Sequence, residues 1–261
     1  MNGQYLMAAL FGALVAVASY SARFLTWTGS VATFILAFVI YGTGGWQWTV
    51  PIVVFFVLSS LLWKYGKSRK IKFEQSFEKS DTRDWGQVFA NGGVAGLVAL
   101  AAGLLPQYDF YPIYLGALAA VTADTWGTEL GVLAGGRTYS VVTLQPVEAG
   151  TSGGVSEAGT IAGACGALVI AFAGYPWYTE MRTAVLVVTG GIAGSLVDSL
   201  LGGTLQSQFR CTACGSNSER RTHCDQPTIL VRGLSWIGND VVNVCCSLTG
   251  AATVWLLLLV F

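Results

Sequence analysis

The run TAVLVVTGGIAGSLVDSLLGGTL, residues 183–205, is apolar enough to cross a bilayer and carries one carboxylate, Asp198, towards its end. An earlier apolar run ends similarly, with Asp124 followed by Glu129 in the stretch ADTWGTELG, residues 123–131. A carboxylate in a membrane segment is costly unless it faces the protein interior or a wet cavity. The repeated phrase therefore predicts one functional site built from two similar halves. The alternative is that each Asp caps a helix or bonds to a neighbouring helix.

The composition indicates an integral membrane protein. Of the 261 residues, 53% are hydrophobic and 11% are charged, and 33 are glycine. These values are typical of a polytopic helical bundle packed through small residues. We expect one all-α transmembrane domain, residues 1–261, with about eight segments and a loose internal repeat. The expected segments are residues 5–20, 29–44, 50–63, 88–105, 110–133, 161–173, 183–205 and 241–261.

The basic residues fall on alternate connections between these segments. All but one of the 14 Lys and Arg residues follow the first, third, fifth or seventh segment, and Arg182 is the exception. The positive-inside rule makes that face cytoplasmic and leaves both termini outside. We therefore expect a multi-pass protein of a bacterial cytoplasmic membrane. A net charge of zero predicts no nucleic-acid partner, and the basic cluster before Trp85 is a topology signal or a headgroup or phosphate site.

The polar residues that could take part in binding or catalysis lie towards the same predicted cytoplasmic face. A site there could meet a soluble nucleotide and a membrane lipid together, which favours an enzyme. A transporter would more naturally place its polar residues near the membrane midplane. A membrane transporter or flippase of a prenyl phosphate or another lipid is the alternative function.

The stretch AGTSGGVSEAGT, residues 149–160, is rich in glycine and hydroxyl groups. Glycines let backbone amides approach an anion, and the start of the next helix would add its positive dipole end. The stretch lacks a Walker lysine, so it is not a P-loop; a Gly/Ser-rich turn with an N-cap is the alternative. The expected phosphate-binding residues are Thr151, Ser152, Gly153, Gly154, Ser156 and Thr160.

Two further groups of polar residues open apolar segments. Arg83, Gln87 and Asn91 are spaced by four, so a helix would place them on one face. Interfacial polar residues are common at helix starts, so this spacing alone is weak support for a site. The last segment opens with Asn239, Asp240 and Asn243.

One predicted cytoplasmic loop, residues 206–237, contains a candidate metal site. Cys211, Cys214, Cys224 and His223, the single histidine of the chain, form a complete tetrahedral zinc set. Disulfides are disfavoured on the reducing side of a membrane. The spacing is tight, so a cysteine-containing loop without metal is the alternative.

These motifs together resemble a known membrane family. The stretches 83–93, 124–131, 150–156 with Gly159 and Thr160, 194–202 and 236–243 look like the successive motifs of the family containing plant phytyl-phosphate kinase and animal transmembrane protein 19. The similarity spans almost the whole chain. The chain is more distantly similar to the CTP-dependent dolichol and phytol kinases.

The resemblance implies transfer of a phosphoryl group from a nucleoside triphosphate, with CTP favoured, to an isoprenyl monophosphate. Such chemistry needs Mg²⁺ on carboxylates, donors around the phosphates and a nearby cation. We expect Asp124, Glu129 and Asp198 to hold Mg²⁺, with Asp240 as a further catalytic acid. The expected substrate or nucleotide contacts outside the glycine-rich stretch are Arg83, Gln87, Asn91, Asn239 and Asn243.

Overall fold

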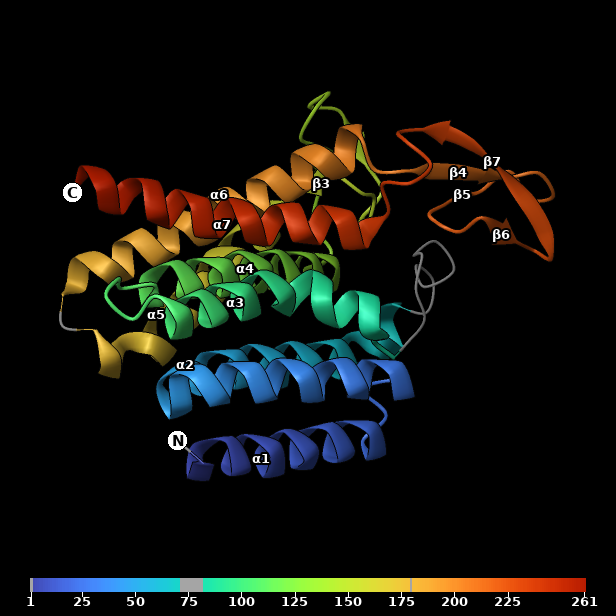
Figure 1. Ribbon diagram of the computed structural model, residues 1–261. Helices are drawn as coiled ribbons and strands as arrows, with labels where there is room; N and C mark the ends of the chain where they lie inside the picture. Colours follow the sequence, from blue (N-terminus) through green and yellow to red (C-terminus); the bar gives the residue numbers. More distant parts are fainter. Residues whose placement is uncertain (1, 71–81, 179) are drawn as a thin grey trace.

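The computed structural model describes residues 2–70, 82–178 and 180–261 and is dominated by long helices (Figure 1). Within the described residues, six helices are long and apolar enough to cross a membrane. The elements are α1 (Asn2–Ser21), α2 (Trp27–Lys70), α3 (Trp85–Leu104), α4 (Tyr111–Ala134), α5 (Glu157–Gly174), the short 3-10 helix η1 (Tyr175–Trp177), α6 (Met181–Thr204) and α7 (Asn239–Val260). The expected membrane-embedded helical fold is confirmed.

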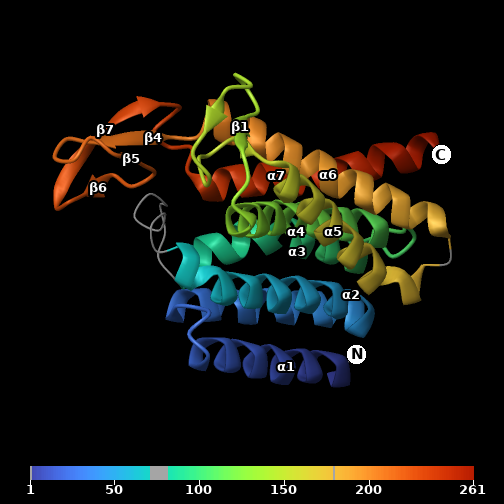
Figure 2. The same cartoon turned by 180° about the vertical axis from the view of Figure 1, so that it is seen from behind.

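Helix α2 consists of two parts that meet at Gly45, whose φ of 60° and ψ of −149° are not helical. Figures 1 and 2 show the two parts running side by side. They correspond to the separate segments expected at residues 29–44 and 50–63. Division of α2 at this point, together with α4, gives eight helical segments within the described residues, near the expected number.

Helix α4 forms the centre of the bundle. Its residues from Tyr114 to Ala123 are at most 1% exposed wherever they are hydrophobic, and α2, α3, α5, α6 and α7 all pack against it. The packing is close because the neighbouring positions are glycines: a Cβ on Gly116 would lie 2.8 Å from the carbonyl oxygen of Gly250 on α7. Asp124 follows directly on this buried stretch, so its position is fixed by the tightest packing in the described bundle.

Two small antiparallel sheets lie at one end of the bundle. The first contains β1 (Thr138–Ser140), β2 (Pro146–Val147) and β3 (Gly154–Val155) in the order β2-β1-β3. The second contains β4 (Gln208–Cys211), β5 (Asn217–Ser218), β6 (Thr222–His223) and β7 (Gln226–Arg232) in the order β5-β4-β7-β6. The connection expected as a loop at residues 206–237 therefore carries a sheet, because the β4–β7 ladder supplies four residue pairs.

Both termini lie at the end of the bundle opposite the two sheets (Figures 1 and 2). The connections α4–α5 and α6–α7 lie at the sheet end, and the connections α3–α4 and α5–α6 at the end with the termini. This arrangement agrees with the expected alternation of the connections. Part of the basic cluster, Lys72 and Lys79, lies outside the described residues.

Candidate functional site

A cavity of about 620 Å³ opens at the sheet end of the bundle, and we call it the polar cavity. Its walls come from α2 to α7, the glycine-rich connection and the connection between α6 and α7. It brings together all the residues predicted for the site except Asp240. The predicted residues that line it are Arg83, Gln87, Asn91, Asp124, Glu129, Thr151, Ser152, Gly153, Gly154, Ser156, Thr160, Asp198, Asn239 and Asn243.

The two repeated aspartates lie next to each other in the lining of this cavity. The side chains of Asp124 on α4 and Asp198 on α6 lie within hydrogen-bonding reach of each other. The second carboxylate oxygen of Asp198 is buried and has no hydrogen-bond partner among the described residues. Two adjacent carboxylates repel one another when both are ionised, so the pair must share a proton or a cation. The geometry therefore fits a hard cation with oxygen ligands.

Arg83 supplies positive charge to the lining of the polar cavity. Its backbone is fixed by bonds to the chain before α2: Arg83 N donates to Phe24 O at 3.1 Å and Thr26 N donates to Arg83 O at 3.0 Å. Its guanidinium carbon lies 5.9 Å from the centre of the Phe56 ring. Burial lowers the pKa of Arg83, while the carboxylate of Glu129 opposes that shift. Arg83 still carries its positive charge near neutral pH, because a guanidinium is not deprotonated in proteins.

Gln87 has a structural role that its predicted contact role did not include. Asp84 is the N-cap of α3, and its carboxylate accepts from Gln87 N at 2.9 Å. The Gln87 side-chain oxygen in turn accepts from Asp84 N at 3.2 Å, which completes a capping box. Asn91 Nδ2 donates to Gln87 O at 2.8 Å. The cap therefore fixes the start of α3, which carries Gln87 and Asn91 towards the cavity. Arg83 precedes the N-cap and lies outside the helix, so only Gln87 and Asn91 share the predicted helical face.

The glycine-rich connection packs directly on the end of α6. Gly153 has a φ of 80°, and a Cβ there would lie 2.5 Å from Gly203 N and 3.0 Å from Ser199 O. The Ser152 hydroxyl lies 2.9 Å from Gly202 O and 2.8 Å from the Gln206 side-chain oxygen. These contacts hold the connection against the helix that carries Asp198.

Ser156 acts as the N-cap of α5, the structural alternative that the sequence left open. Its Oγ accepts from Gly159 N at 3.1 Å, and Thr160 Oγ1 donates to Ser156 O at 3.0 Å. The N-terminus of α5 thus lies at the cavity wall, where its dipole favours an anion.

The position of Asp240 differs from the prediction. Asn239 and Asn243 line the polar cavity, but Asp240 is not among the described residues that line it. The reason is helix periodicity: positions i and i+4 share a face, and position i+1 is turned away by about 100°. The catalytic role expected for Asp240 therefore has no geometric support.

Among the lining residues that the sequence analysis did not name, three polar ones belong to the connection between α6 and α7. Gln206, Glu219 and Arg220 line the polar cavity. Gln206 is 3% exposed, and its Nε2 donates to Glu219 Oε1 at 2.9 Å. The adjacent charged residues Glu219 and Arg220, midway between Cys214 and His223, were the sequence signal that could have identified this part of the wall.

A second cavity of about 360 Å³ adjoins the first, and we call it the apolar cavity. It shares Phe24, Arg83, Gln87 and Asn91 with the polar cavity. Beyond these shared residues, its walls are mainly aliphatic and aromatic side chains from α1 and both parts of α2, together with the hydroxyl groups of Ser19, Thr33 and Thr49. They include Phe11, Leu36, Ile40, Ile52, Val53 and Phe56.

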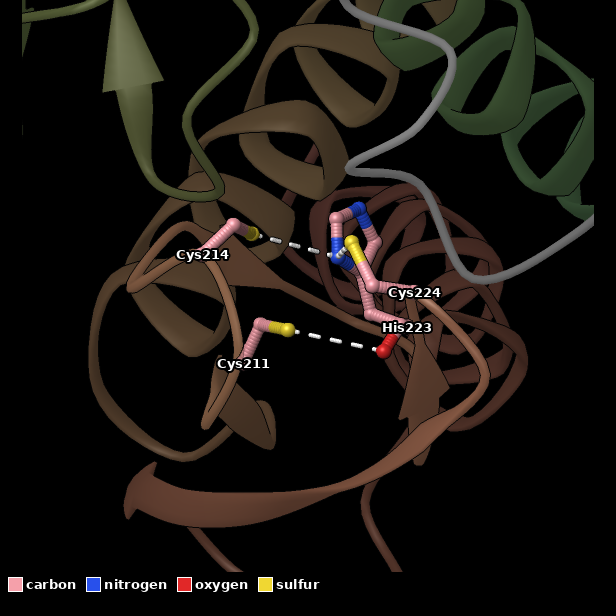
Figure 3. Close-up of side chains that lie close together, drawn as sticks. All are labelled: Cys211, Cys214, His223 and Cys224. Atoms are coloured by element: carbon pink, nitrogen blue, oxygen red, sulfur yellow. Dashed lines mark hydrogen bonds between the residues drawn. The ribbon is translucent and has the colours of Figure 1, made fainter.

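The predicted metal-binding side chains of the α6–α7 connection lie close together (Figure 3). The ligand atoms of Cys211, Cys214, His223 and Cys224 all lie within 4.8 Å of one another. Hydrogen bonds with Ser216 lower the pKa of the Cys214 thiol to about 6. Its neighbour Cys214 raises the pKa of Cys224 to about 11. A thiolate at one of these cysteines therefore opposes ionisation of the next, because the two negative charges repel each other. A bound cation would remove this repulsion.

A comparison with known protein families identifies the family of this chain. Residues 10–251 match the model described as "Integral membrane protein DUF92". The chain belongs to this family. The motif resemblance to the family of phytyl-phosphate kinase and transmembrane protein 19 is thereby confirmed.

Three curated relatives illustrate the similarity of this DUF92 member to other proteins. Protein PGR of Arabidopsis thaliana is 30% identical over 79% of this chain and 81% of its own length. An uncharacterised membrane protein of Methanocaldococcus jannaschii is 32% identical over 67% of this chain and 71% of its own. The chloroplastic protein VTE6 of Arabidopsis thaliana is 24% identical over 84% of this chain and 61% of its own. No solved structure matches the chain.

Proposed function

We propose that this DUF92 protein is an isoprenyl-phosphate kinase that transfers a phosphoryl group from a nucleoside triphosphate, with CTP favoured, to a prenyl monophosphate. One observation carries the proposal: a polar cavity with paired carboxylates adjoins an apolar cavity between membrane helices, and Arg83 belongs to both walls. A prenyl monophosphate has the same division into a charged head and a hydrocarbon tail. The motif resemblance adds the reaction type.

The apolar cavity suits the prenyl tail. Its walls are mainly aliphatic and aromatic, so a hydrocarbon chain would lose no hydrogen bonds on entry. Binding of the tail in this cavity would place the phosphate beside Arg83. The guanidinium of Arg83 can bind phosphate oxygens through two parallel N–H donors. Gln87 and Asn91 belong to the same junction between the cavities.

The polar cavity suits Mg²⁺ and the nucleotide. The adjacent carboxylates and the buried, unpartnered oxygen of Asp198 are oxygen ligands of the kind that Mg²⁺ prefers. Asp124 and Asp198 would hold the ion, with Glu129 on the same wall. Bound Mg²⁺ would neutralise phosphate charge during transfer. The residues from Thr151 to Ser156, the start of α5, Asn239 and Asn243 would bind and orient the triphosphate.

The reaction needs no general base from the protein. A phosphate monoester has a second pKa of about 6, so the prenyl phosphate is largely a dianion near neutral pH. One of its oxygens attacks the terminal phosphorus of the nucleotide, the bond from that phosphorus to the bridging oxygen breaks, and the nucleoside diphosphate leaves. The residues of the two cavities therefore need only bind and orient the two substrates and stabilise the charge that develops during transfer.

A direct assay tests this function. Purified protein receives phytyl or geranylgeranyl monophosphate, Mg²⁺ and each of the four nucleoside triphosphates labelled at the terminal phosphate. We expect labelled prenyl diphosphate with wild-type protein and with Glu180→Gln, which changes an exposed carboxylate outside the polar cavity, but not with Asp198→Asn. Movement of prenyl phosphate across sealed vesicles without any diphosphate would contradict the kinase and favour a transporter.

A further inference from the structure

The connection between α6 and α7, residues 206–237, contains a second site that the proposed kinase reaction does not use. We call it the Cys/His module. Its base is tied to the bundle, because Ser207 N donates to Ile237 O at 2.8 Å and Leu234 N donates to Leu205 O at 3.0 Å. Arg232 at the end of β7 donates to Gly202 O at 2.8 Å.

The outer part of the module is held much less firmly than its base. β5 pairs with β4, and β6 with β7, through two residue pairs each, against four between β4 and β7. Few apolar side chains support it: Ile229 and Trp236 are 62% and 68% exposed, while Phe209 is buried. Small units with such sparse cores usually need a disulfide or a metal. The segment between β4 and β7 therefore needs a further link.

The side chains of Cys211, Cys214, His223 and Cys224 lie between the β4 side and the β6 side of the module, where a link would join the two. Cys211 ends β4 and Cys214 follows in the turn, while His223 ends β6 and Cys224 opens the turn to β7. Figure 3 shows the side chains converging from these two segments. His223 Nδ1 lies 3.5 Å from Cys214 Sγ and 3.2 Å from Cys224 Sγ. Ligands about 2.3 Å from a tetrahedral zinc are about 3.8 Å apart, so the cluster already has nearly the size of the site.

We propose that Cys211, Cys214, His223 and Cys224 bind one structural zinc ion, and that this ion holds Glu219 and Arg220 at the wall of the polar cavity. Three thiolates and one imidazole fill the four positions of a closed structural site, which leaves none for a substrate. The ion joins the β4 side of the module to the β6 side. It thereby closes the segment that carries both wall residues.

A chain of hydrogen bonds continues from this segment to the glycine-rich connection. Gln206 Nε2 donates to Glu219 Oε1 at 2.9 Å, and the Ser152 hydroxyl lies 2.8 Å from Gln206 Oε1. Thr228 Oγ1 donates to Arg220 O at 2.8 Å, which ties the other wall residue to β7. Zinc binding stands independently of the proposed kinase, whereas any effect of Glu219 and Arg220 on nucleotide binding rests on that function.

The first test measures the metal in the full-length protein in detergent. Elemental analysis should find about one zinc per chain. Cys214→Ser, which changes an exposed thiol, should lose at least half of it, and Cys165→Ser, which changes an exposed cysteine outside the cluster, should retain it. Replacement of zinc by Co²⁺ should give the absorption bands of tetrahedral thiolate coordination. Zinc-free protein that also takes up no Co²⁺ into such a site would overturn the proposal.

The second test measures the effect of the ion on the wall residues. Trypsin cleaves after Arg220 and Arg221, so the rate of cleavage there reports on the order of that segment. Chelation of the wild-type zinc should raise this rate at least about tenfold, and added zinc should restore protection, since the outer segment would otherwise rest on two short ladders. An unchanged rate in protein shown to have lost its zinc would contradict the positioning role. Neither readout requires kinase activity, so a failed kinase assay would leave both conclusions in place.

Discussion

The two adjoining cavities differ in the way they are built. The polar cavity is lined by residues of α2 to α7 and of the connections α4–α5 and α6–α7, and it holds paired acids, whereas the apolar cavity lies mainly among α1 and the two parts of α2. They share Arg83, Gln87 and Asn91 at the start of α3. The difference indicates that head and tail of one amphiphilic ligand are bound by separate regions of the chain. Changes in one region should therefore affect chemistry, and changes in the other should affect the choice of tail.

The largest effect is expected for Asp198→Asn. This change removes one charge from the adjacent carboxylates and should lower kcat by more than about 100-fold, because metal-centred charge stabilisation is worth several kcal/mol. Binding of the prenyl phosphate tail should change little. Turnover is measured with labelled nucleotide, and tail binding by displacement of a fluorescent prenyl phosphate. If folded Asp198→Asn protein lost both turnover and tail binding, the two cavities would not act as separate binding regions.

Arg83→Gln should affect both cavities, since Arg83 lies at their junction. Loss of a charge-assisted bond to the prenyl phosphate costs about 1.5–3 kcal/mol, so kcat/KM should fall about 10- to 100-fold. Prenyl alcohol, which has no phosphate, should bind wild-type and variant equally. A variant with unchanged kcat/KM would remove Arg83 from the substrate site.

Gly153→Ala tests the support of the polar cavity by α6. The φ of 80° and the approach of Gly203 N leave no room for a Cβ, so the change should cost about 1–3 kcal/mol of local stability. Activity should fall with it, because the connection would move away from Asp198. Gly136→Ala is the matched control, since a Cβ there meets nothing within 4 Å. Equal thermal stability and activity in the two variants would show that the close approach is unimportant.

Ile52→Phe should produce the smallest effect and act on the tail alone. A larger side chain in the apolar cavity should shift preference towards shorter prenyl chains by about tenfold, the usual range for a methylene-scale change in an apolar pocket. kcat for the shortest substrate should stay near wild type. Leu97→Phe is the control, because Leu97 is 67% exposed and is not among the described residues lining the apolar cavity. The comparison is made by competition between two chain lengths in one assay.

The sequence was sufficient to predict the polar cavity but not the apolar one. Asp124 and Asp198 stood out because an acid in an apolar segment is costly, and each comes after an apolar helical run. Ile52 and Phe56 carry no such signal, since an apolar residue facing a cavity has the same composition as one facing lipid. Their role depends on the reversal of the chain at Gly45, which places the two parts of α2 beside each other.

Two differences between the predicted and the observed lining of the polar cavity also have physical causes. Asp240 was grouped with Asn239 and Asn243 because they are close in sequence, although helix rotation turns it off their face. Glu219 and Arg220 were passed over because their approach to the cavity depends on a sheet and on the buried side chain of Gln206. Neither the sheet nor that contact follows from local spacing.

The central claim is that one amphiphilic ligand spans both cavities. Geranylgeranyl monophosphate with a photoreactive group near the end of its tail tests it most directly, with the adducts mapped by mass spectrometry. The account predicts adducts on Leu36, Ile52 or Phe56 that are reduced in Arg83→Gln and competed by unlabelled prenyl phosphate. Adducts confined to outward-facing residues such as Leu97, unchanged by Arg83→Gln, would contradict it.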